Sequence, residues 1–216
     1  MESVFSLPGR EIRLHLVKDV EALITDPEDE DKVPCWAEVW PAARGLASYI
    51  WENLSFGGER VIELGAGIGL PGVVCGLKGA RVTFSDFNPL ALEVAAKNAA
   101  SNGLADYSLL LGDWRCFPRS HSFDYVVGSD IFYDPKLNVH LARVIDSCLP
   151  AGGRVLLAHP GREASFNFIR GLLSAGYGLE KEALHPVVID DPYFPYYEIR
   201  INVLTKKSGR CIPAGP

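Results

Sequence analysis

The sequence has few cysteines, no long apolar run and no excess of positive charge. Its five cysteines are scattered and include no Cys-x-x-Cys pair; they are Cys35, Cys75, Cys116, Cys148 and Cys211. Neither a disulfide framework nor a zinc site is therefore expected. No apolar stretch reaches the length of a membrane-spanning helix, and the first residues lack the pattern of a secretory signal. We expect a cytoplasmic protein with no membrane partner.

The balance of charge disfavours nucleic acid as a partner. The formal net charge is −6 and the isoelectric point is about 5.4, which opposes binding to phosphates and suits a basic partner surface. Solubility alone also accounts for such a charge. With 216 residues, 48% hydrophobic and 22% charged, the chain can form one globular domain with a full core. We expect a monomer.

A glycine-rich stretch follows a β-branched run. Residues 61–71 read Val-Ile-Glu-Leu-Gly-Ala-Gly-Ile-Gly-Leu-Pro, which predicts a buried strand that turns sharply into a helix opened by Pro71. The glycines let the backbone approach a ligand, and the helix start offers free N–H groups. The dinucleotide fingerprint G-x-G-x-x-G needs a glycine where Leu70 stands. A nicotinamide-dependent dehydrogenase is thus disfavoured, although unrelated α/β proteins also contain glycine-rich turns.

Strands and helices alternate through most of the chain. Strands are expected at 60–64, 81–85, 107–111, 123–128 and 154–158, and helices begin at Pro41, Leu70, Pro89 and Pro135, with another around Phe166. This order predicts an α/β fold, a doubly wound Rossmann-like sheet with right-handed crossovers. Segments 177–184 and 197–205 predict a C-terminal antiparallel hairpin, which completes a mostly parallel seven-stranded sheet.

The chain is expected to have one main domain. Residues 1–33 contain a predicted hairpin, with a strand at 11–18, and an acidic loop at 26–31; they form an accessory segment. Most such acidic loops are only solvated, although this one could also guide a basic substrate. Residues 34–207 form the main domain, and residues 208–216 are expected to be a disordered tail.

Four acids lie at the ends of the first four predicted strands: Glu63, Asp86, Asp113 and Asp130. Ligands of doubly wound sheets bind beyond the carboxyl ends of the strands. The Asp86 carboxylate can accept hydrogen bonds from both hydroxyls of a ribose. Alternatively, Asp86 serves the dipole of the following helix, and Asp113 is a turn residue.

These motifs resemble the seven-strand, class I methyltransferases that use S-adenosylmethionine, and among them the lysine enzymes of methyltransferase family 16. The likeness covers about residues 34–175 and rests on Trp40-Pro41-Ala42, on residues 63–71 and on the segment 127–134. His159-Pro160-Gly161-Arg162 is similar to the Asp-Pro-Gly-Arg of the branch that methylates the β subunit of electron-transfer flavoprotein. Here His159 replaces the aspartate.

The resemblance implies S-adenosylmethionine as the cofactor, no metal, and a set of cofactor-binding residues. Glu63 would accept a hydrogen bond from the methionine ammonium, and Trp40 would flank the methionine end. Asp113 would accept a hydrogen bond from the adenine amine, and Trp114 would pack on the adenine face. Trp36 and Trp40 could instead be core residues. The expected cofactor-binding residues are Trp40, Glu63, Gly65, Ala66, Gly67, Gly69, Asp86, Phe87, Asp113, Trp114 and Ser129.

Asp130 and Tyr133 form a D-x-x-Y motif and are the predicted catalytic residues. A lysine ammonium, with a reference pKa of about 10.4, has no lone pair, so a neutral amine must be presented in line with the methyl group. Asp130 would direct the amine, and Tyr133 would supply an aromatic wall. As an alternative Asp130 caps a helix, although Asp134 is better placed for that. Arg162 could bind a substrate carboxylate or pair with an acid of the site.

The sequence therefore predicts an S-adenosylmethionine-dependent N-methyltransferase whose partner is a protein substrate that presents a lysine. Methylation of nucleic acid or glutamine is disfavoured, because Ile131 and Phe132 replace the prolines of N/D-P-P-Y. Two alternatives stay open. The first is a small-molecule amine methyltransferase, over whose substrate the aromatic loop 192–197 could close, and the second is a non-catalytic cofactor-binding module.

Overall fold

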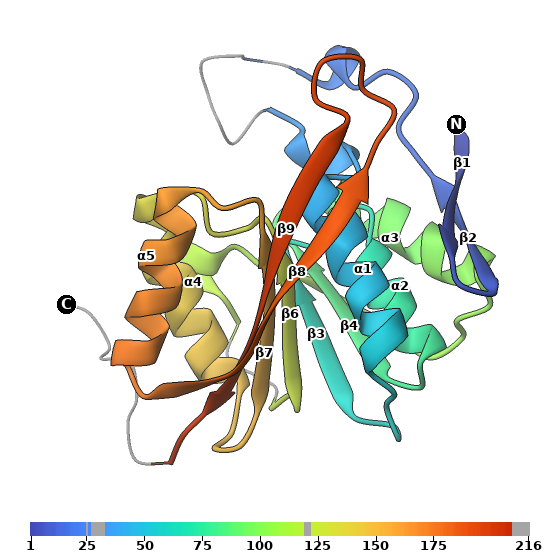
Figure 1. Ribbon diagram of the computed structural model, residues 1–216. Coiled ribbons are helices and arrows are strands. Elements are labelled where there is room, and N and C mark those ends of the chain that lie inside the picture. Colours follow the sequence, from blue (N-terminus) through green and yellow to red (C-terminus); the bar gives the residue numbers. More distant parts are fainter. Residues whose placement is uncertain (25, 27–32, 119–121, 209–216) are drawn as a thin grey trace.

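The computed structural model describes residues 1–24, 26, 33–118 and 122–208, and its main body is a sheet with helices on both faces (Figure 1). The sheet strands are β3 (Arg60–Leu64), β4 (Arg81–Asp86), β5 (Tyr107–Leu111), β6 (Tyr125–Ser129), β7 (Arg154–His159), β8 (Tyr177–Val188) and β9 (Tyr196–Lys206). The α-helices are α1 (Pro41–Asn53), α2 (Leu70–Leu77), α3 (Pro89–Ser101), α4 (Pro135–Cys148) and α5 (Glu163–Ser174).

The seven-stranded sheet has the order β5-β4-β3-β6-β7-β9-β8. Strands β3 to β7 are parallel, whereas β9 runs antiparallel to both β7 and β8. Helices α1, α2 and α3 cover one face and α4 and α5 cover the other (Figure 1). The predicted doubly wound sheet with a closing antiparallel hairpin is confirmed.

Local sequence explains where the helices start. Each of the helices α1, α3 and α4 begins with a proline, whose missing N–H has no partner to lose at that position. The side chains of Asn88 and Asp134 accept hydrogen bonds from Leu90 N and Lys136 N at 2.9 and 2.8 Å, which caps α3 and α4.

The C-terminal hairpin is longer than predicted. Strand β8 continues past residue 184 to Val188, and β9 begins at Tyr196. β8 includes Pro186 and is an edge strand, on which a proline can be tolerated.

The predicted N-terminal hairpin is present as β1 (Glu2–Leu7) and β2 (Arg10–His15). It is not a loose appendage, because its side chains Phe5, Leu7, Ile12 and Leu14 are buried in the core that also contains α1, α2 and α3. The expected strand at 11–18 ends earlier, at His15. Most of the predicted acidic loop and nearly all of the predicted tail, residues 209–216, lie outside the described residues.

Two further observations concern the described residues alone. The helices formed by these residues include none with the length and hydrophobicity of a membrane span. Cys75, Cys116 and Cys148 are free thiols, and Cys211 lies outside the described part of the chain.

Candidate active site

The loop from β3 to α2 depends on its glycines. Gly65, Gly67 and Gly69 have φ angles of 59°, 52° and 79°, which side-chain-bearing residues rarely adopt. Space is also short. A Cβ atom on Gly67 would lie 2.9 Å from the carbonyl oxygen of Trp36, and one on Gly65 would lie 2.7 Å from Cγ2 of Ile131. The loop is therefore held between the N-terminal segment and the residues that follow β6.

Glu63 lies beneath this loop. Its side chain accepts a hydrogen bond from Gly72 N at 2.9 Å, at the start of α2, and only 1% of the residue is exposed. Burial raises the pKa of Glu63 well above its usual value, and the nearby charge of Asp86 raises it further. Gly72 leaves the room that this contact needs, since a Cβ there would meet the Glu63 carboxylate at 2.5 Å.

Asp86 joins the end of β4 to the glycine loop. Its two carboxylate oxygens accept hydrogen bonds from Gly67 N and Asn88 N, both at 2.9 Å. The residue is 3% exposed, and burial raises the pKa of its carboxyl group. Each oxygen accepts one of these bonds and has a further lone pair. The next residue, Phe87, is 48% exposed and offers an aromatic face at the same edge of the sheet.

Asp113 and Trp114 differ in what surrounds them. The Asp113 carboxylate binds the Arg115 guanidinium, with 2.8 Å between Oδ2 and Nη2, and also accepts a hydrogen bond from Arg115 N. Its hydrogen bond with the Arg115 side chain lowers the pKa of Asp113. Asp113 thus stabilises the short η4 helix (Trp114–Cys116), as the turn alternative predicted; its adenine role stays a prediction. Trp114 lies close to Gly65.

Asp130 stands in a strained conformation directly after β6. Its φ of 54° is the one positive value that a non-glycine residue shows in the described ranges, and such outliers cluster at functional sites. The side chain is 8% exposed and forms an ion pair with Nη1 of Arg162. Burial raises the pKa of Asp130, and Arg162 opposes that effect. The helix-cap alternative for Asp130 is wrong, since Asp134 caps α4.

His159 shapes the turn that carries Arg162. Its Nδ1 accepts a hydrogen bond from Gly161 N at 3.1 Å, so Nε2 carries the hydrogen and donates to Asn202 Oδ1 at 3.2 Å. The ring is 1% exposed, and burial lowers the pKa of His159, which favours the neutral form. His159 thus holds the turn through its side chain at the position where the similar motif has an aspartate. Sequence reasoning assigned no role to Asn202, which is distant along the chain.

The remaining predicted residues differ in exposure, and only Trp40 and Tyr133 lie at the exposed rim. Trp40 is 38% exposed and donates from Nε1 to Cys35 O at 2.7 Å, whereas the backbone of Trp36 is the part of this segment that contacts the loop. Tyr133 is 49% exposed and Ala66 is buried. Ser129 ends β6 and is partly buried.

A profile of the lysine methyltransferase family, Methyltransf_16, matches residues 18–174. The chain belongs to this lysine methyltransferase family. The matched segment runs from just after the N-terminal hairpin to the end of α5 and includes the glycine loop, Asp86, Asp130 and Arg162.

Several relatives support this membership. The chain is 36% identical over 153 residues to EEF1A lysine methyltransferase 3 of Mus musculus, covering 67% of this chain and 65% of that protein. It is 29% identical over 152 residues to the histidine protein methyltransferase 1 homolog of Dictyostelium discoideum, covering 65% of this chain and 48% of that protein. The chain thus spans between about half and two thirds of the length of these relatives.

Solved structures share the fold of this chain. The Pyrococcus horikoshii protein PH1948 has a TM-score of 0.64 and 17% identity, over 90% of this chain and 93% of that one. Ribosomal protein L11 methylase from Lactobacillus delbrueckii subsp. bulgaricus has a TM-score of 0.59 and 18% identity, over 76% of this chain and 79% of that one. At these identities the likeness shows the class I methyltransferase fold.

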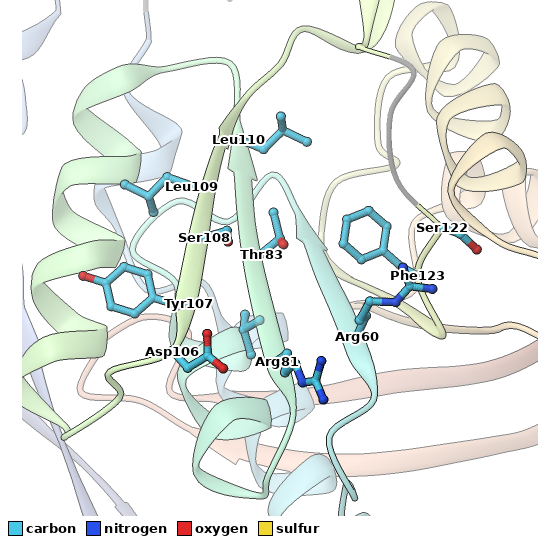
Figure 2. A pocket seen from close by; sticks show the side chains of 11 residues that line it. Arg60, Arg81, Thr83, Asp106, Tyr107, Ser108, Leu109, Leu110, Ser122 and Phe123 are labelled. Carbon is cyan, nitrogen blue, oxygen red and sulfur yellow. The ribbon is translucent and has the colours of Figure 1, made fainter.

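A cavity also lies at the other end of the sheet, away from the glycine loop. It measures about 270 Å³ and is bordered by Arg60, Arg81 and Tyr107, which begin β3, β4 and β5, and by Leu110 and Phe123. In Figure 2, Leu110 and Phe123 lie on one side of β5 and Tyr107 on the other. The strand starts lie opposite the carboxyl edge, so this cavity is not the predicted site. No cluster of metal-binding side chains occurs among the described residues.

Proposed function

We propose that this chain is an S-adenosylmethionine-dependent methyltransferase that methylates a lysine side chain of a protein. The observation that carries the proposal is a pair of buried acids, Glu63 and Asp86, beside the glycine loop. Among the described residues neither forms an ion pair. Buried charges are normally paired, so these acids fit a ligand that brings positive charge.

The residues present fit that cofactor. S-adenosylmethionine supplies a methyl group made electrophilic by its positively charged sulfur, and it also carries an ammonium group. Glu63 would hold the ammonium and Asp86 the ribose hydroxyls, while Phe87 and Trp114 offer aromatic faces to the adenine. A bound cation would favour the charged forms of both acids and lower the pKa values that burial raises.

Asp130 and Arg162 would prepare the substrate amine. Asp130 can accept a hydrogen bond from the amine and direct its lone pair. A bare carboxylate would also attract the ammonium form and raise its pKa. The guanidinium of Arg162 shares the negative charge of Asp130, which weakens that unwanted effect. Tyr133 lies at the exposed rim, where it would border the lysine side chain.

Support for a protein lysine comes from the family and from the D-x-x-Y motif. The names of the relatives include EEF1A lysine methyltransferase 3 and protein N-lysine methyltransferase METTL21A of Xenopus tropicalis, the latter 37% identical over 103 residues. Others are named for histidine or arginine, so the methylated amino acid itself must be identified.

The test is transfer of labelled methyl from S-adenosylmethionine to the proteins of a cell extract, followed by amino-acid analysis. We expect methyl-lysine with the wild-type chain and a loss of about 100-fold or more with Asp130→Asn, a typical cost for a positioning group. Asp134→Asn, which alters only a helix cap, should keep most of the activity. Label confined to small molecules or nucleic acid would reject the proposal.

A further inference from the structure

The β8–β9 hairpin projects beyond the rest of the sheet. Pairing between β7 and β9 ends at His159 and Arg200, whereas pairing between β8 and β9 continues to Val188 and Tyr196. At a rise of about 3.3 Å per residue, residues 196–199 extend roughly 13 Å past the end of β7. The turn lies at the carboxyl edge of the parallel strands (Figure 1), and Asp130 follows the carboxyl end of β6 at that edge.

The end of this hairpin exposes an unusual amount of apolar surface. Val188, Tyr193, Phe194 and Tyr196, which we name the aromatic tip, are exposed by 75%, 84%, 68% and 59%. Single exposed apolar residues are common, but a cluster of large ones marks an interaction surface. Aromatic side chains are also enriched among the residues that dominate binding energy.

Hydrogen bonds within the turn hold the backbone of the aromatic tip. Asp191 Oδ1 accepts hydrogen bonds from Tyr193 N and Phe194 N, both at 2.8 Å, and Ile189 N donates to Pro195 O at 3.0 Å. Two prolines, at positions 192 and 195, further restrict the turn. A surface held in place in this way loses little conformational entropy on binding.

Charge around the aromatic tip selects the kind of partner. Asp190 and Glu198 are exposed beside it, and Asp191 lies at its base. The chain as a whole carries a net charge of −6. Acidic surroundings repel an anionic membrane or nucleic acid and attract basic peptide segments, whose lysines and arginines also bind aromatic faces.

We propose that the aromatic tip docks a basic, lysine-bearing segment of the protein substrate and thereby brings one lysine to Asp130. This inference rests on the proposed function, because it assigns a docking surface to the same reaction. The tip lies beyond residue 174, where the family match ends, and at the carboxyl edge of the sheet (Figure 1), where β6 ends directly before Asp130.

The test compares two double variants of the full chain. Tyr193→Ser with Phe194→Ser removes two of the exposed aromatic side chains of the tip. Leu179→Ser with Leu184→Ser is the matched control, because these leucines are 45% and 50% exposed on the same hairpin but outside the tip. The substrate probe is a dilution series of cell-extract proteins with labelled S-adenosylmethionine. Binding of S-adenosylhomocysteine, measured by calorimetry, reports on the cofactor site.

We expect the tip variant to lose about tenfold or more in kcat/KM, through a higher KM, since hot-spot aromatics typically contribute that much. Its rate should approach the wild-type rate in concentrated extract, and its affinity for S-adenosylhomocysteine should not change. The control variant should label proteins as the wild type does.

Three results would overturn the assignment. If the wild type labels proteins and the tip variant labels them equally well, the docking surface is wrong and the proposed function stands. If the wild type labels no protein, the proposed function fails and docking fails with it. Tip-dependent binding to phosphatidylcholine vesicles, or a tip-dependent dimer in light scattering, would assign the surface to another partner.

Discussion

At the scale of single residues, burial changes the chemistry of the acids at the carboxyl edge. Glu63 and Asp86 accept backbone hydrogen bonds, yet burial still raises their pKa values. A folded protein that keeps such acids charged loses part of its stability. Because these acids lie beside the glycine loop, this cost fits a ligand site, where bound positive charge would offset it.

Replacing Glu63 with glutamine should raise stability at high pH. The raised pKa means that folded Glu63 binds more protons than unfolded Glu63, so the wild type loses stability as pH rises from about 4.3, the unfolded value, through the folded pKa. The glutamine side chain keeps an acceptor for Gly72 N and has no charge. We expect thermal melting to show a gain in melting temperature at pH 8 and a smaller gain at pH 5.

The matched control is Glu52→Gln, since Glu52 is exposed on α1. Its melting temperature should follow the wild type at both pH values. The Glu63→Gln variant should also bind S-adenosylhomocysteine more weakly, because it loses the acceptor charge for the methionine ammonium. An equal gain at the two pH values would contradict the pKa argument.

At the scale of elements, helix α3 links the N-terminal hairpin to the glycine loop. Asn98 Oδ1 accepts from His15 N at 2.6 Å, and Asn98 Nδ2 donates to Ile68 O at 2.8 Å. Asn102 similarly accepts from Arg13 N and donates to Arg13 O, at 2.9 and 2.7 Å. The two amides thus satisfy the free edge of β2 in place of another strand.

Removing the Asn98 side chain, which makes this link, should affect both stability and cofactor binding. Asn98→Ala leaves backbone groups of His15 and Ile68 without partners, which costs about 3 kcal/mol. Because Ile68 lies between Gly67 and Gly69, affinity for S-adenosylhomocysteine should fall as well. Urea denaturation and calorimetry would measure the two effects. The control is Lys97→Ala at the exposed neighbouring position, which should change neither the stability nor the affinity for S-adenosylhomocysteine by much. If Asn98→Ala binds S-adenosylhomocysteine as the wild type does, the link is refuted.

At the scale of the whole molecule, one sheet joins two hydrophobic cores. Val61 and Ile62 are neighbours in β3, yet Val61 belongs to the core with α1, α2 and α3 and Ile62 to the core with α4 and α5. This follows from the alternation of side chains along a strand. Loss of β3 would therefore disrupt both cores together, so we expect the chain to unfold as one unit.

A substitution that creates a cavity in either core should lower the free energy of one shared unfolding transition. Leu46 in the first core and Leu141 in the second are both fully buried. Changing either to alanine should cost about 2–5 kcal/mol and leave a single unfolding step in circular dichroism and tryptophan fluorescence. Two separate steps in either variant would show that the cores unfold independently.

Much of the architecture was predictable because its signals are local. Alternating hydrophobic patterns, helix-opening prolines and the caps Asn88 and Asp134 predicted the parallel strands and their helices. The glycine spacing predicted a loop that only glycines can form. The full length of β8 was not predictable, because its position at the edge of the sheet, where Pro186 can be tolerated, arises only from folding.

The sequence by itself determined the α/β order, the three loop glycines and the acids at the strand ends, since these depend on residues close together along the chain. Tertiary structure alone decided which distant groups meet. It brings Arg162 to Asp130, Asn202 to His159 and Asn98 to Ile68, because the crossover connections place these segments side by side. It also extends the last hairpin beyond the sheet, where pairing between β8 and β9 needs no support from β7.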